Sequence, residues 1–493
     1  MPRPCLSLFT DPRLIVALYS FPRSHRGRSK AVDFDKFVKT YDVRGLVGSE
    51  LTPELIECFG AGFADELELM GNSLVVGHDM RDSSPGFANA FAQGAIKRGA
   101  SVVMIGLCST DMTYFASGKL DLPAAMFTAS HNPASYNGIK FSRAGARGIS
   151  LDTGLANIRD RAKKYFDEGI DAVATLGNSH EQSVLDDYAD YLHSLVDLSG
   201  TRKLKIVVDV ANGMGGLTVP AVLSRLSQLE IVPMYFELDG NFPNHEANPL
   251  DVKNLVDLQK KVVEVGADLG LAFDGDADRC FAVDEKGMAV SPSAVAAIVS
   301  RREVERVRAV GEKEKDVVVI HNALTSNFVA ETIELAGAKP HRTKVGHSLI
   351  KDQMAQTGAV FGGEHSAHYY FRDFWGADNG MLAAMHLMSE LGESDSSMSE
   401  IAMRNTPYFS SGEINSLVDD KQAALDRVRQ ELEFETEEEF DGNTFHGKTA
   451  ENWWWCNIRP SNTEPLLRLN VESNHEALMI EIRDKAIRQI RNS

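Results

Sequence analysis

Residues 123–140 read Pro-Ala-Ala-Met-Phe-Thr-Ala-Ser-His-Asn-Pro-Ala-Ser-Tyr-Asn-Gly-Ile-Lys, an apolar run followed by a polar loop. The apolar run predicts a buried strand that delivers Ser130 onto a loop at its carboxyl end, where α/β sheets bind ligands. A basic or cationic neighbour, such as His131 or Lys140, makes a serine a useful nucleophile or phosphoryl carrier. An ordinary surface turn explains the same residues about equally well, because Asn, Pro, Ser and Gly are turn formers.

Strand and helix patterns repeat on both sides of this loop. Strands at 73–78 and 101–106 flank a helix at 85–98, which predicts a parallel α/β unit that 123–127 extends. A second unit has a helix at 186–198, a strand at 203–210, a tight Gly-rich turn at 211–216 and a helix at 252–267. A third has a strand at 317–321, a helix at 326–338 and a basic loop at 344–351. From residue 401 the pattern becomes that of a smaller α+β domain.

These patterns predict an α/β protein with three similar mixed α/β domains followed by a smaller α+β C-terminal domain. The predicted boundaries are 31–185 for domain I, 186–290 for domain II, 291–400 for domain III and 401–493 for domain IV. Residues 1–30 carry several basic residues around a short apolar patch, and we expect a disordered extension there.

Composition excludes some functions. The chain has 493 residues, enough for roughly three to four domains. Its formal net charge of -19 opposes nucleic-acid binding, so any phosphate ligand needs a local cationic patch. The five cysteines have no zinc or disulfide spacing, which favours a reducing cytoplasm. No apolar run approaches the length of a membrane span.

Three carboxylates follow the apolar strand that begins at residue 268. Asp274, Asp276 and Asp278 alternate, and they would repel one another unless a cation held them. Such oxygen ligands favour magnesium or calcium over zinc. An EF-hand is excluded because Arg279 stands where that loop needs Gly, and a strand precedes the loop where a helix is required. An aspartyl-phosphate phosphatase motif and a solvated acidic turn remain as alternatives.

Two further loops carry groups that suit a sugar phosphate. Glu364, Ser366 and His368 alternate, so in an extended segment they would point the same way and could bind hydroxyl groups. A polar strand face is the alternative. Residues 459–465, Arg-Pro-Ser-Asn-Thr-Glu-Pro, suit a phosphate dianion, although a polar hairpin turn explains them equally well. Near the start, Arg44 and Gly45 suggest a guanidinium on a tight turn, although a surface Arg beside a turn Gly explains these two residues better when they are taken alone.

Together these motifs resemble the α-D-phosphohexomutase family, most of all its bacterial phosphomannomutases and phosphoglucomutases. The matching stretches are 41–45, 128–140, 274–279, 363–368 and 459–465, in family order, and 238–250 is similar to the bacterial phosphomannomutase branch. Two features depart from the family pattern. Ala367 stands where many members have Gly, which could narrow the sugar pocket, and residues 1–30 have no counterpart.

The resemblance implies a central cleft and a magnesium-dependent isomerase. Phosphoserine 130 would pass its phosphoryl group to a hexose monophosphate, giving a hexose 1,6-bisphosphate that turns over and returns the other phosphoryl group. One Mg²⁺ per chain would sit on Ser130 and the three aspartates, with hexose 1,6-bisphosphate as activator. The implied catalytic residues are Ser130, Arg44, Lys140, His368 and His131. The implied substrate-binding residues are Arg279, Lys344, His347, Glu364, Ser366, His368, Arg459, Ser461, Asn462, Thr463 and Arg468.

Within the family we expect a phosphomannomutase. The alternatives are an enzyme with both phosphomannomutase and phosphoglucomutase activity, a phosphoglucomutase and a phosphoglucosamine mutase. His365 stands where glucosamine mutases usually carry Gln, which argues for mannose or glucose. A metal-dependent phosphohydrolase and a non-catalytic sugar-phosphate-binding protein are the alternatives from other classes. We expect hexose phosphates as partners, no nucleic acid or membrane, a monomer or homodimer, and a cytoplasmic location.

Overall fold

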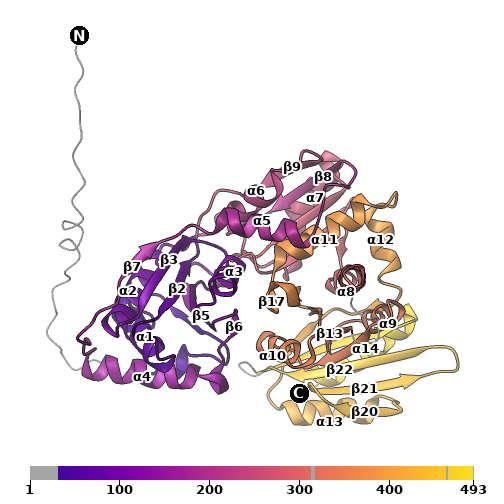
Figure 1. Cartoon of the computed structure of the whole chain (residues 1–493). Helices are drawn as coiled ribbons and strands as arrows, with labels where there is room; N and C mark the ends of the chain where they lie inside the picture. Colours follow the sequence, from indigo (N-terminus) through magenta and orange to yellow (C-terminus); the bar gives the residue numbers. More distant parts are fainter. Residues whose placement is uncertain (1–31, 312–316, 462–464, 492–493) are drawn as a thin grey trace.

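Four sheets follow one another along the chain in the computed structural model, which describes residues 32–311, 317–461 and 465–491. Figure 1 shows domain I in indigo on the left, domain II in magenta at the top, and domains III and IV in orange and yellow on the right. The prediction of three mixed α/β domains and a smaller α+β domain is confirmed. The predicted N-terminal extension, residues 1–30, lies outside the described residues.

The first three sheets share one topology. In domains II and III, three parallel strands are followed by two antiparallel strands added at one edge. Domain I has the same three parallel strands, β3-β2-β4, followed by antiparallel β5, with β1, β6 and β7 in addition. The loop that joins the last parallel strand to the first antiparallel strand is β4–β5 in domain I, β10–β11 in domain II and β15–β16 in domain III. The Ser130 loop, the aspartate loop and the Glu364 loop therefore occupy equivalent positions in three related domains.

Domain I contains the seven-stranded sheet β1-β5-β4-β2-β3-β7, with β6 paired to β5. Helix α1 begins where Thr52 accepts a hydrogen bond from the Leu55 amide and Pro53 occupies the first turn. The strands are β1 Val43–Leu46, β2 Ser73–His78, β3 Ser101–Leu107, β4 Ala124–Phe127, β5 Tyr136–Arg143, β6 Arg147–Gly148 and β7 Ser179–Glu181. The helices are η2 Phe34–Lys36, α1 Pro53–Glu66, α2 Ser84–Lys97, α3 Thr110–Leu120, η3 Leu151–Thr153 and α4 Leu155–Glu168.

Domain II contains the sheet β12-β11-β10-β8-β9. Its elements are α5 Leu185–Leu195, β8 Leu204–Asp209, α6 Gly215–Leu223, β9 Leu229–Met234, η4 Val252–Leu255, α7 Val256–Val265, β10 Leu269–Phe273, β11 Cys280–Asp284 and β12 Ala289–Val290. The Gly-rich stretch at 211–216 is a tight strand-to-helix turn, as predicted. The Met214 amide donates to the Gly275 carbonyl at 2.9 Å, so this turn supports the aspartate loop.

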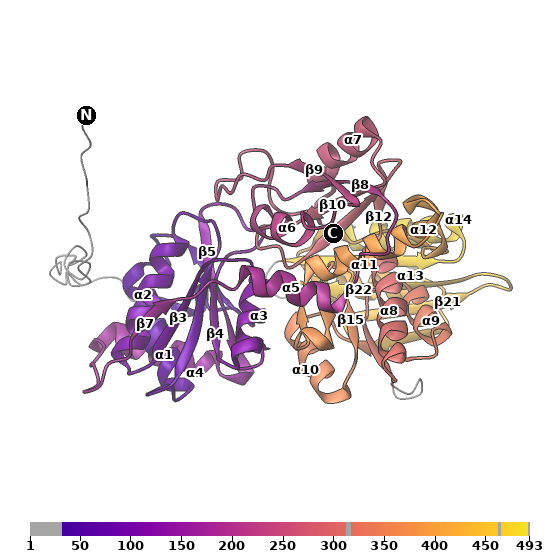
Figure 2. The same cartoon turned by 45° about the horizontal axis from the view of Figure 1, so that its top comes forward.

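Domain III contains the sheet β14-β13-β15-β16-β17. Figure 2 shows its helices α8 and α9 on one side of this sheet and α10 on another. The elements are α8 Pro292–Ala309, β13 Val318–Asn322, α9 Asn327–Leu335, β14 Lys339–Thr343, α10 His347–Thr357, β15 Phe361–Gly363, β16 Tyr369–Phe371, η6 Arg372–Phe374, β17 Ala377–Asp378, α11 Gly380–Gly392 and α12 Met398–Arg404.

Domain IV is an antiparallel sheet, β18-β23-β22-β21-β20 with β19 on β23, that packs against two helices. Its elements are β18 Phe409–Ser410, β19 Ile414–Leu417, α13 Lys421–Glu431, β20 Thr436–Glu439, β21 Asn443–Lys448, β22 Trp453–Pro460, β23 Leu466–Ser473 and α14 Glu476–Arg491. The predicted phosphate loop joins β22 to β23. No helix in the described part of the chain is long and apolar enough to cross a membrane.

Buried apolar side chains join the first three domains. One buried cluster includes Phe115 of α3, Tyr188 of α5 and Phe374 of η6, which come from domains I, II and III. Tyr191 of α5 stacks on Trp375 with ring centroids 5.1 Å apart. Separate clusters lie against α1, α2 and α4 of domain I, against α10 of domain III and within domain IV.

Two local predictions are wrong. Arg44 does not lie on a tight turn but within β1, where it pairs with Gly138 of β5. Glu364, Ser366 and His368 do not alternate along an extended segment. The Ala367 amide donates to the Glu364 carbonyl and Ala367 has φ +64°, so residues 364–367 form the turn between β15 and β16.

Candidate active site

Three loops from three domains meet at Ser130. The backbone of Arg279 in the aspartate loop forms a β-bridge with His368 in the Glu364 loop. Each loop has one non-glycine residue in the left-handed region: Ser130 with φ +48°, Ala277 with φ +61° and Ala367 with φ +64°. Such strained residues gather at functional sites because the surrounding structure must hold them.

The Ser130 hydroxyl faces the first aspartate. Its Oγ donates to Asp274 Oδ2 at 2.9 Å and lies 3.2 Å from His131 Nδ1. Arg279 Nη2 also contacts His131 Nδ1, at 2.5 Å. Because a guanidinium can only donate, this imidazole nitrogen must be an acceptor. The side chain of Ser130 is buried, so the hydroxyl is shielded from bulk water.

The aspartate triplet is fully buried. Lys140 Nζ contacts Asp276 Oδ2 at 2.8 Å and Asp278 Oδ2 at 2.6 Å, and Arg279 Nε donates to Asp274 Oδ2 at 2.8 Å. Among the described residues, Oδ1 of Asp276 and Oδ1 of Asp278 have no hydrogen-bond partner. One oxygen from each of the three carboxylates lies within 4.8 Å of the others. These buried oxygens fit a hard divalent cation such as Mg²⁺.

Burial and charge set the protonation of this cluster. Burial raises the pKa of Asp274 to about 7, although the Arg279 guanidinium opposes the shift. Burial also disfavours ionisation of Asp276, but the Lys140 ammonium outweighs it and holds the pKa of that carboxyl well below its usual range. Against burial, Asp276 and Asp278 hold the pKa of Lys140 well above its usual value. Lys140 is therefore a stable ammonium group at neutral pH.

His131 has the opposite character. Burial lowers its pKa well below the usual value, and the nearby Arg279 and Arg44 guanidinium groups lower it further. A neutral imidazole agrees with the acceptor role that Arg279 imposes on Nδ1. The side chain of Arg44 is itself held by Asn132 Oδ1 at 2.8 Å and Asp42 Oδ2 at 2.6 Å.

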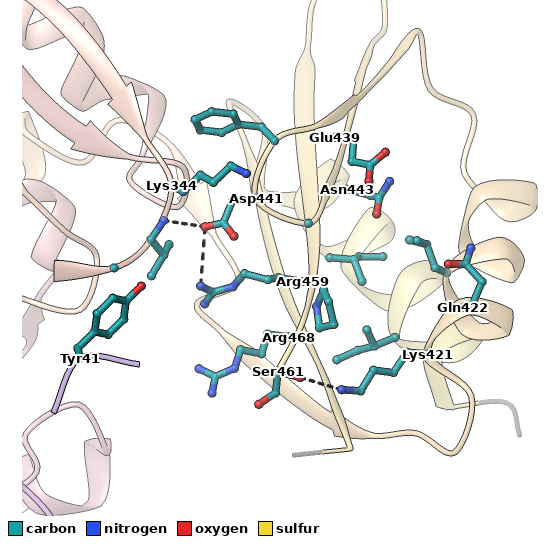
Figure 3. Close-up of a pocket in the computed structure, with 18 residues that line it drawn as sticks. Tyr41, Lys344, Lys421, Gln422, Glu439, Asp441, Asn443, Arg459, Ser461 and Arg468 are labelled. Atoms are coloured by element: carbon teal, nitrogen blue, oxygen red, sulfur yellow. Dashed lines mark hydrogen bonds and ion pairs between the residues drawn. The ribbon is translucent and has the colours of Figure 1, made fainter. Parts of the chain in front are cut away.

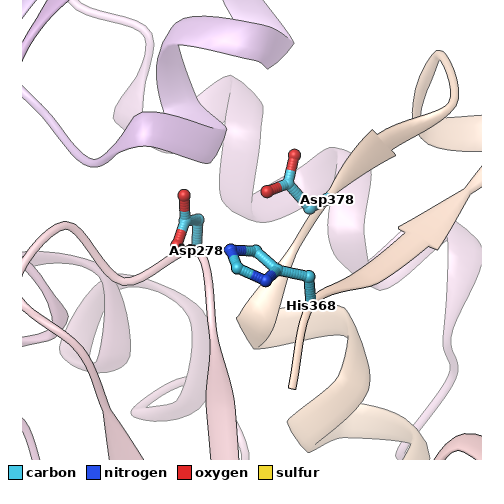
Figure 4. A group of neighbouring side chains, drawn as sticks. All are labelled: Asp278, His368 and Asp378. Carbon is cyan, nitrogen blue, oxygen red and sulfur yellow. Dashed lines mark ion pairs between the residues drawn. The ribbon is translucent and has the colours of Figure 1, made fainter. Parts of the chain in front are cut away.

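His368 lies at the edge of the same cluster. Its Nε2 is 4.0 Å from Asp278 Oδ1, and its Nδ1 is 3.0 Å from Ser366 Oγ. Figure 4 shows its ring beside Asp278 and near Asp378. These three residues could also hold a metal by their geometry. Lys351 pairs with Asp378 at 2.7 Å and Lys140 pairs with Asp278, so two ammonium groups already balance these carboxylates. The triplet is the better metal candidate, because its two cations, Lys140 and Arg279, leave one of its three carboxylates unbalanced.

Glu364 is buried, and its carboxylate is already engaged. It accepts from the Tyr370 hydroxyl at 2.6 Å and from Asn322 Nδ2 at 3.2 Å. Ser366 lines a cavity of about 760 Å³, which His365 and Arg468 also line. The Glu364 loop thus offers Ser366 and His368 to a ligand, while Glu364 lies behind them.

The phosphate loop borders a second cavity of about 790 Å³, shown in Figure 3. Arg459 and Arg468 line both cavities. The described lining of the second cavity has four basic residues, Lys344, Lys421, Arg459 and Arg468, and two acidic ones, Glu439 and Asp441. This is the local cationic patch that a phosphate ligand needs in an acidic protein. Ser461 also lines it, whereas Asn462, Thr463 and the side chain of His347 lie outside the described residues.

Internal carboxylates hold the two arginines of this cavity. Glu413 is 3.3 Å from Arg459 and 3.0 Å from Arg468. Asp441 is 3.9 Å from Arg459 and also accepts from the Val345 amide at 2.7 Å, which links domains III and IV. Tyr41 of domain I lines the same cavity, so three domains contribute to it.

Sequence reasoning missed two residues that support the centre. Thr110, the first residue of α3, donates its hydroxyl to Asp276 Oδ2 at 2.5 Å and its amide to the Asp276 carbonyl at 3.1 Å. Arg81 is buried beneath the Ser130 loop. Arg81 and Asp79 follow the predicted strand at 73–78, so the rule that located Ser130 at a strand's carboxyl end could have located them.

Comparison with known proteins identifies all four domains. Phosphoglucomutase/phosphomannomutase family models match residues 35–168 as alpha/beta/alpha domain I, 186–287 as domain II, 291–408 as domain III and 413–489 as the C-terminal domain. The chain is 38% identical over 454 residues to "Phosphohexose mutases" of Xanthomonas campestris, covering 91% of this chain and 97% of that protein.

Two further relatives show the same extent of similarity. A phosphomannomutase of Salmonella montevideo is 35% identical over 461 residues, with 92% of this chain and 98% of that protein covered. A crystal structure of a phosphoglucomutase/phosphomannomutase family protein from Burkholderia thailandensis superposes with a TM-score of 0.80 at 28% identity, covering 92% of this chain and 97% of that one. The matches span all four domains, and the chain belongs to the phosphoglucomutase/phosphomannomutase family.

Proposed function

We propose that this protein interconverts hexose 1-phosphate and hexose 6-phosphate, with mannose phosphates preferred, through a phosphoserine at Ser130 and a hexose 1,6-bisphosphate intermediate. The observation that carries the proposal is the Ser130 hydroxyl, 2.9 Å from Asp274 in a buried carboxylate cluster that suits a divalent cation. Phosphoryl transfer needs positioning and charge stabilisation more than covalent chemistry, and this cluster can supply both.

Asp274, Asp276 and Asp278 would hold one Mg²⁺ beside the phosphoserine. When bound, the ion would neutralise charge on the transferring phosphoryl group. Arg279 already contacts Asp274 Oδ2 and the Ser130 hydroxyl, so it would hold the serine and the carboxylate in a fixed relative position. Its near-complete burial makes these hydrogen bonds strong and fixed.

Of Arg44, Lys140 and His368, we assign the proton-accepting role to His368. Lys140 retains its proton because two carboxylates contact it, and it would stabilise charge on the transferred group. Arg44 has its guanidinium bound to Asp42 and Asn132, and it would act as a fixed cation. Within the described part of the chain, the ion-pair partner of His368 Nε2 is Asp278 Oδ1, at 4.0 Å, so this nitrogen can turn toward a sugar hydroxyl.

The rest of the cleft would bind the sugar phosphate. Ser366, backed by Glu364, would contact sugar hydroxyl groups in both binding orientations. The phosphate that is not reacting would be bound by Arg459, Ser461 and Arg468, together with Asn462 and Thr463. Supporting residues would be His131 beside Ser130 and Lys344 and His347 beside the phosphate-binding residues. A hexose 1,6-bisphosphate would prime the enzyme by phosphorylating Ser130.

The preference for mannose rests on the relatives. The Salmonella protein bears the name phosphomannomutase, and it aligns with nearly the whole chain. His365 is half-buried, contacts Ser293 Oγ at 3.2 Å and lines the same cavity as Ser366. Because glucosamine mutases usually carry Gln at this position, His365 supports a preference for mannose or glucose.

Phosphorus NMR tests the proposal. Purified protein is incubated with Mg²⁺, a trace of hexose 1,6-bisphosphate, and either mannose 1-phosphate or glucose 1-phosphate. The 6-phosphate is the expected product, formed faster from mannose 1-phosphate. Release of inorganic phosphate would identify a phosphohydrolase instead, and saturable binding without any product would identify a sugar-phosphate-binding protein.

A further inference from the structure

Arg81 is a fully buried arginine beneath the Ser130 loop, with a side chain 1% exposed. Its Nη1 donates to the carbonyls of Pro133 at 2.9 Å and Tyr136 at 3.0 Å. Its Nη2 donates to the carbonyls of Ser130 at 2.8 Å and Asn132 at 2.7 Å. Its Nε contacts Asp79 at 3.2 Å. All five N–H donors of the guanidinium therefore have acceptors.

These bonds act on a strained loop. Ser130 has φ +48°, a left-handed conformation that is unfavourable for an L-residue. Four carbonyls of the loop converge on one guanidinium, and one of them belongs to Ser130 itself. A planar fork with fixed donor directions can bind several carbonyls at once, whereas an ammonium is a point charge with three donors.

Domain II packs against Arg81. The Arg81 guanidinium lies 5.1 Å from the centroid of the Phe242 ring. A Cβ on Gly240 would lie 2.7 Å from the Arg81 Cα, so the 239–242 loop packs directly on it. On the other side, a Cβ on Gly275 would lie 2.5 Å from the Ser130 carbonyl oxygen. The carbonyl that Arg81 binds is therefore pressed against the aspartate loop.

We propose that Arg81 is a positioning residue that fixes the Ser130 hydroxyl over the aspartate triplet by binding the backbone of the Ser130 loop. The inference rests on the proposed phosphoserine function. Arg81 touches no reacting atom, because its side chain is buried and all its donors are bound to this loop and to Asp79. Its role is to set the distance between Ser130 Oγ and Asp274, and Asp79 in turn fixes the guanidinium.

R81K tests this role, because lysine keeps the charge beside Asp79 but cannot bind four carbonyls. We expect kcat for hexose phosphate to fall by about 10- to 100-fold, since a displacement of about 1 Å costs roughly that factor. KM should change less than twofold, because the arginines of the phosphate loop are untouched. The rate of Ser130 phosphorylation by hexose 1,6-bisphosphate, followed by intact mass, should fall with kcat.

R98K is the matched control. Arg98 lies in the same domain, pairs with Asp65 at 2.9 Å, donates to a backbone carbonyl of Asp171 and lies 5.6 Å from the Tyr165 ring, but it does not contact the Ser130 loop. We expect R98K to lower Tm without changing kcat. If R81K and R98K lower kcat equally, the effect is one of general stability and the positioning role is overturned.

A crystal structure of R81K separates this inference from the proposed function. The Ser130 hydroxyl is expected to leave hydrogen-bond distance of Asp274, and an unchanged loop overturns the inference whatever the reaction is. A wild-type protein that takes up no phosphate on Ser130 would instead reject the proposed function.

If R81K does not fold, D79N replaces it, and we expect kcat to fall by about 10-fold. A folded D79N with wild-type kcat would overturn the inference.

Discussion

The Ser130 centre and the phosphate loop bind charge in different ways. At the Ser130 centre, Arg279 and all three aspartates are almost fully buried, and Lys140 contacts two carboxylates at 2.8 and 2.6 Å. At the phosphate loop, the side chain of Arg468 is 32% exposed and that of Glu413 is 24% exposed. Arg459 lies 3.3 Å from Glu413 and 3.9 Å from Asp441. The first region has short contacts away from water, and the second has longer contacts beside two cavities.

The difference reflects what each region must do. Fixed dipoles and charges stabilise a transition state best when they need no reorganisation during the reaction. A phosphate that arrives and leaves in each turnover needs cations whose present partners can be exchanged. Exposed ion pairs are weak enough to allow such an exchange, whereas breaking a buried pair is costly. Substitutions in the first region should therefore affect kcat, and those in the second should affect KM.

Ser130→Ala should have the largest effect. It removes the group that would carry the phosphate, so turnover is expected to fall to background while the thermal stability stays near that of the wild type. Phosphorus NMR and a thermal melt measure the two properties. Ser135→Ala, an exposed serine in the same loop, is the control and should keep its activity. Full activity in folded Ser130→Ala would contradict the assignment.

Arg459→Ala tests the second region. Loss of a charged hydrogen-bonding partner for phosphate should raise KM by about 10- to 100-fold, because such interactions contribute roughly 1.5–3 kcal/mol. The kcat should change by no more than a few fold. Arg427→Ala, in the same domain but bound to the carbonyl of Gln489, should leave KM unchanged. A fall in kcat with constant KM would erase the contrast between the two regions.

Thr110→Val tests whether the hydrogen bond from Thr110 to Asp276 contributes to metal binding. It removes the hydroxyl that binds Asp276 while keeping the shape of the side chain, and loss of such a partner typically lowers metal affinity by about 10- to 100-fold. Calorimetric titration with Mg²⁺ or Mn²⁺ measures this without relying on turnover. Thr113→Val, buried one turn further along α3, should bind metal like the wild type. Equal affinities for the two variants would argue against the role of Thr110.

Asp111 gives the smallest expected effect on turnover, because its titration acts on stability. Burial raises its pKa to about 7, although the Ser109 and Tyr188 hydroxyls oppose the shift. An acid whose folded pKa is raised binds its proton more tightly when folded, so stability is lost as pH rises from about 4 to 7. Relative to Asp111→Asn, the wild type should lose up to about 1.4 kcal/mol per pH unit in this range. Thermal melts of both proteins between pH 5 and 8 provide the measurement; parallel curves would contradict it.

Local motifs were predictable from the sequence, and contacts between distant residues were not. Ser130 and the aspartates each sit directly after an apolar strand, so one rule located both. Thr110 was missed because its partner Asp276 is 166 residues away, and nothing nearby marks it. The turn at 364–367 differs from the extended segment that the sequence predicts, because alternating polar residues occur in turns as well as in strands. The left-handed backbone of Ala367 is the feature that marks it as a turn. Gly45 after Arg44 predicts a turn, yet this position needs a glycine because the side chains of Phe37 and Glu50 lie close to its backbone.

The separate hydrophobic cluster of domain IV has a consequence for how the protein unfolds. Because one cluster joins α3, α5 and η6, the parts of domains I to III that pack in it should lose their structure as a single cooperative unit. Domain IV, with its own core, can open or unfold while that unit stays intact. The phosphate-binding end can therefore accumulate destabilising substitutions, or move to admit substrate, without loosening the packing that holds Ser130.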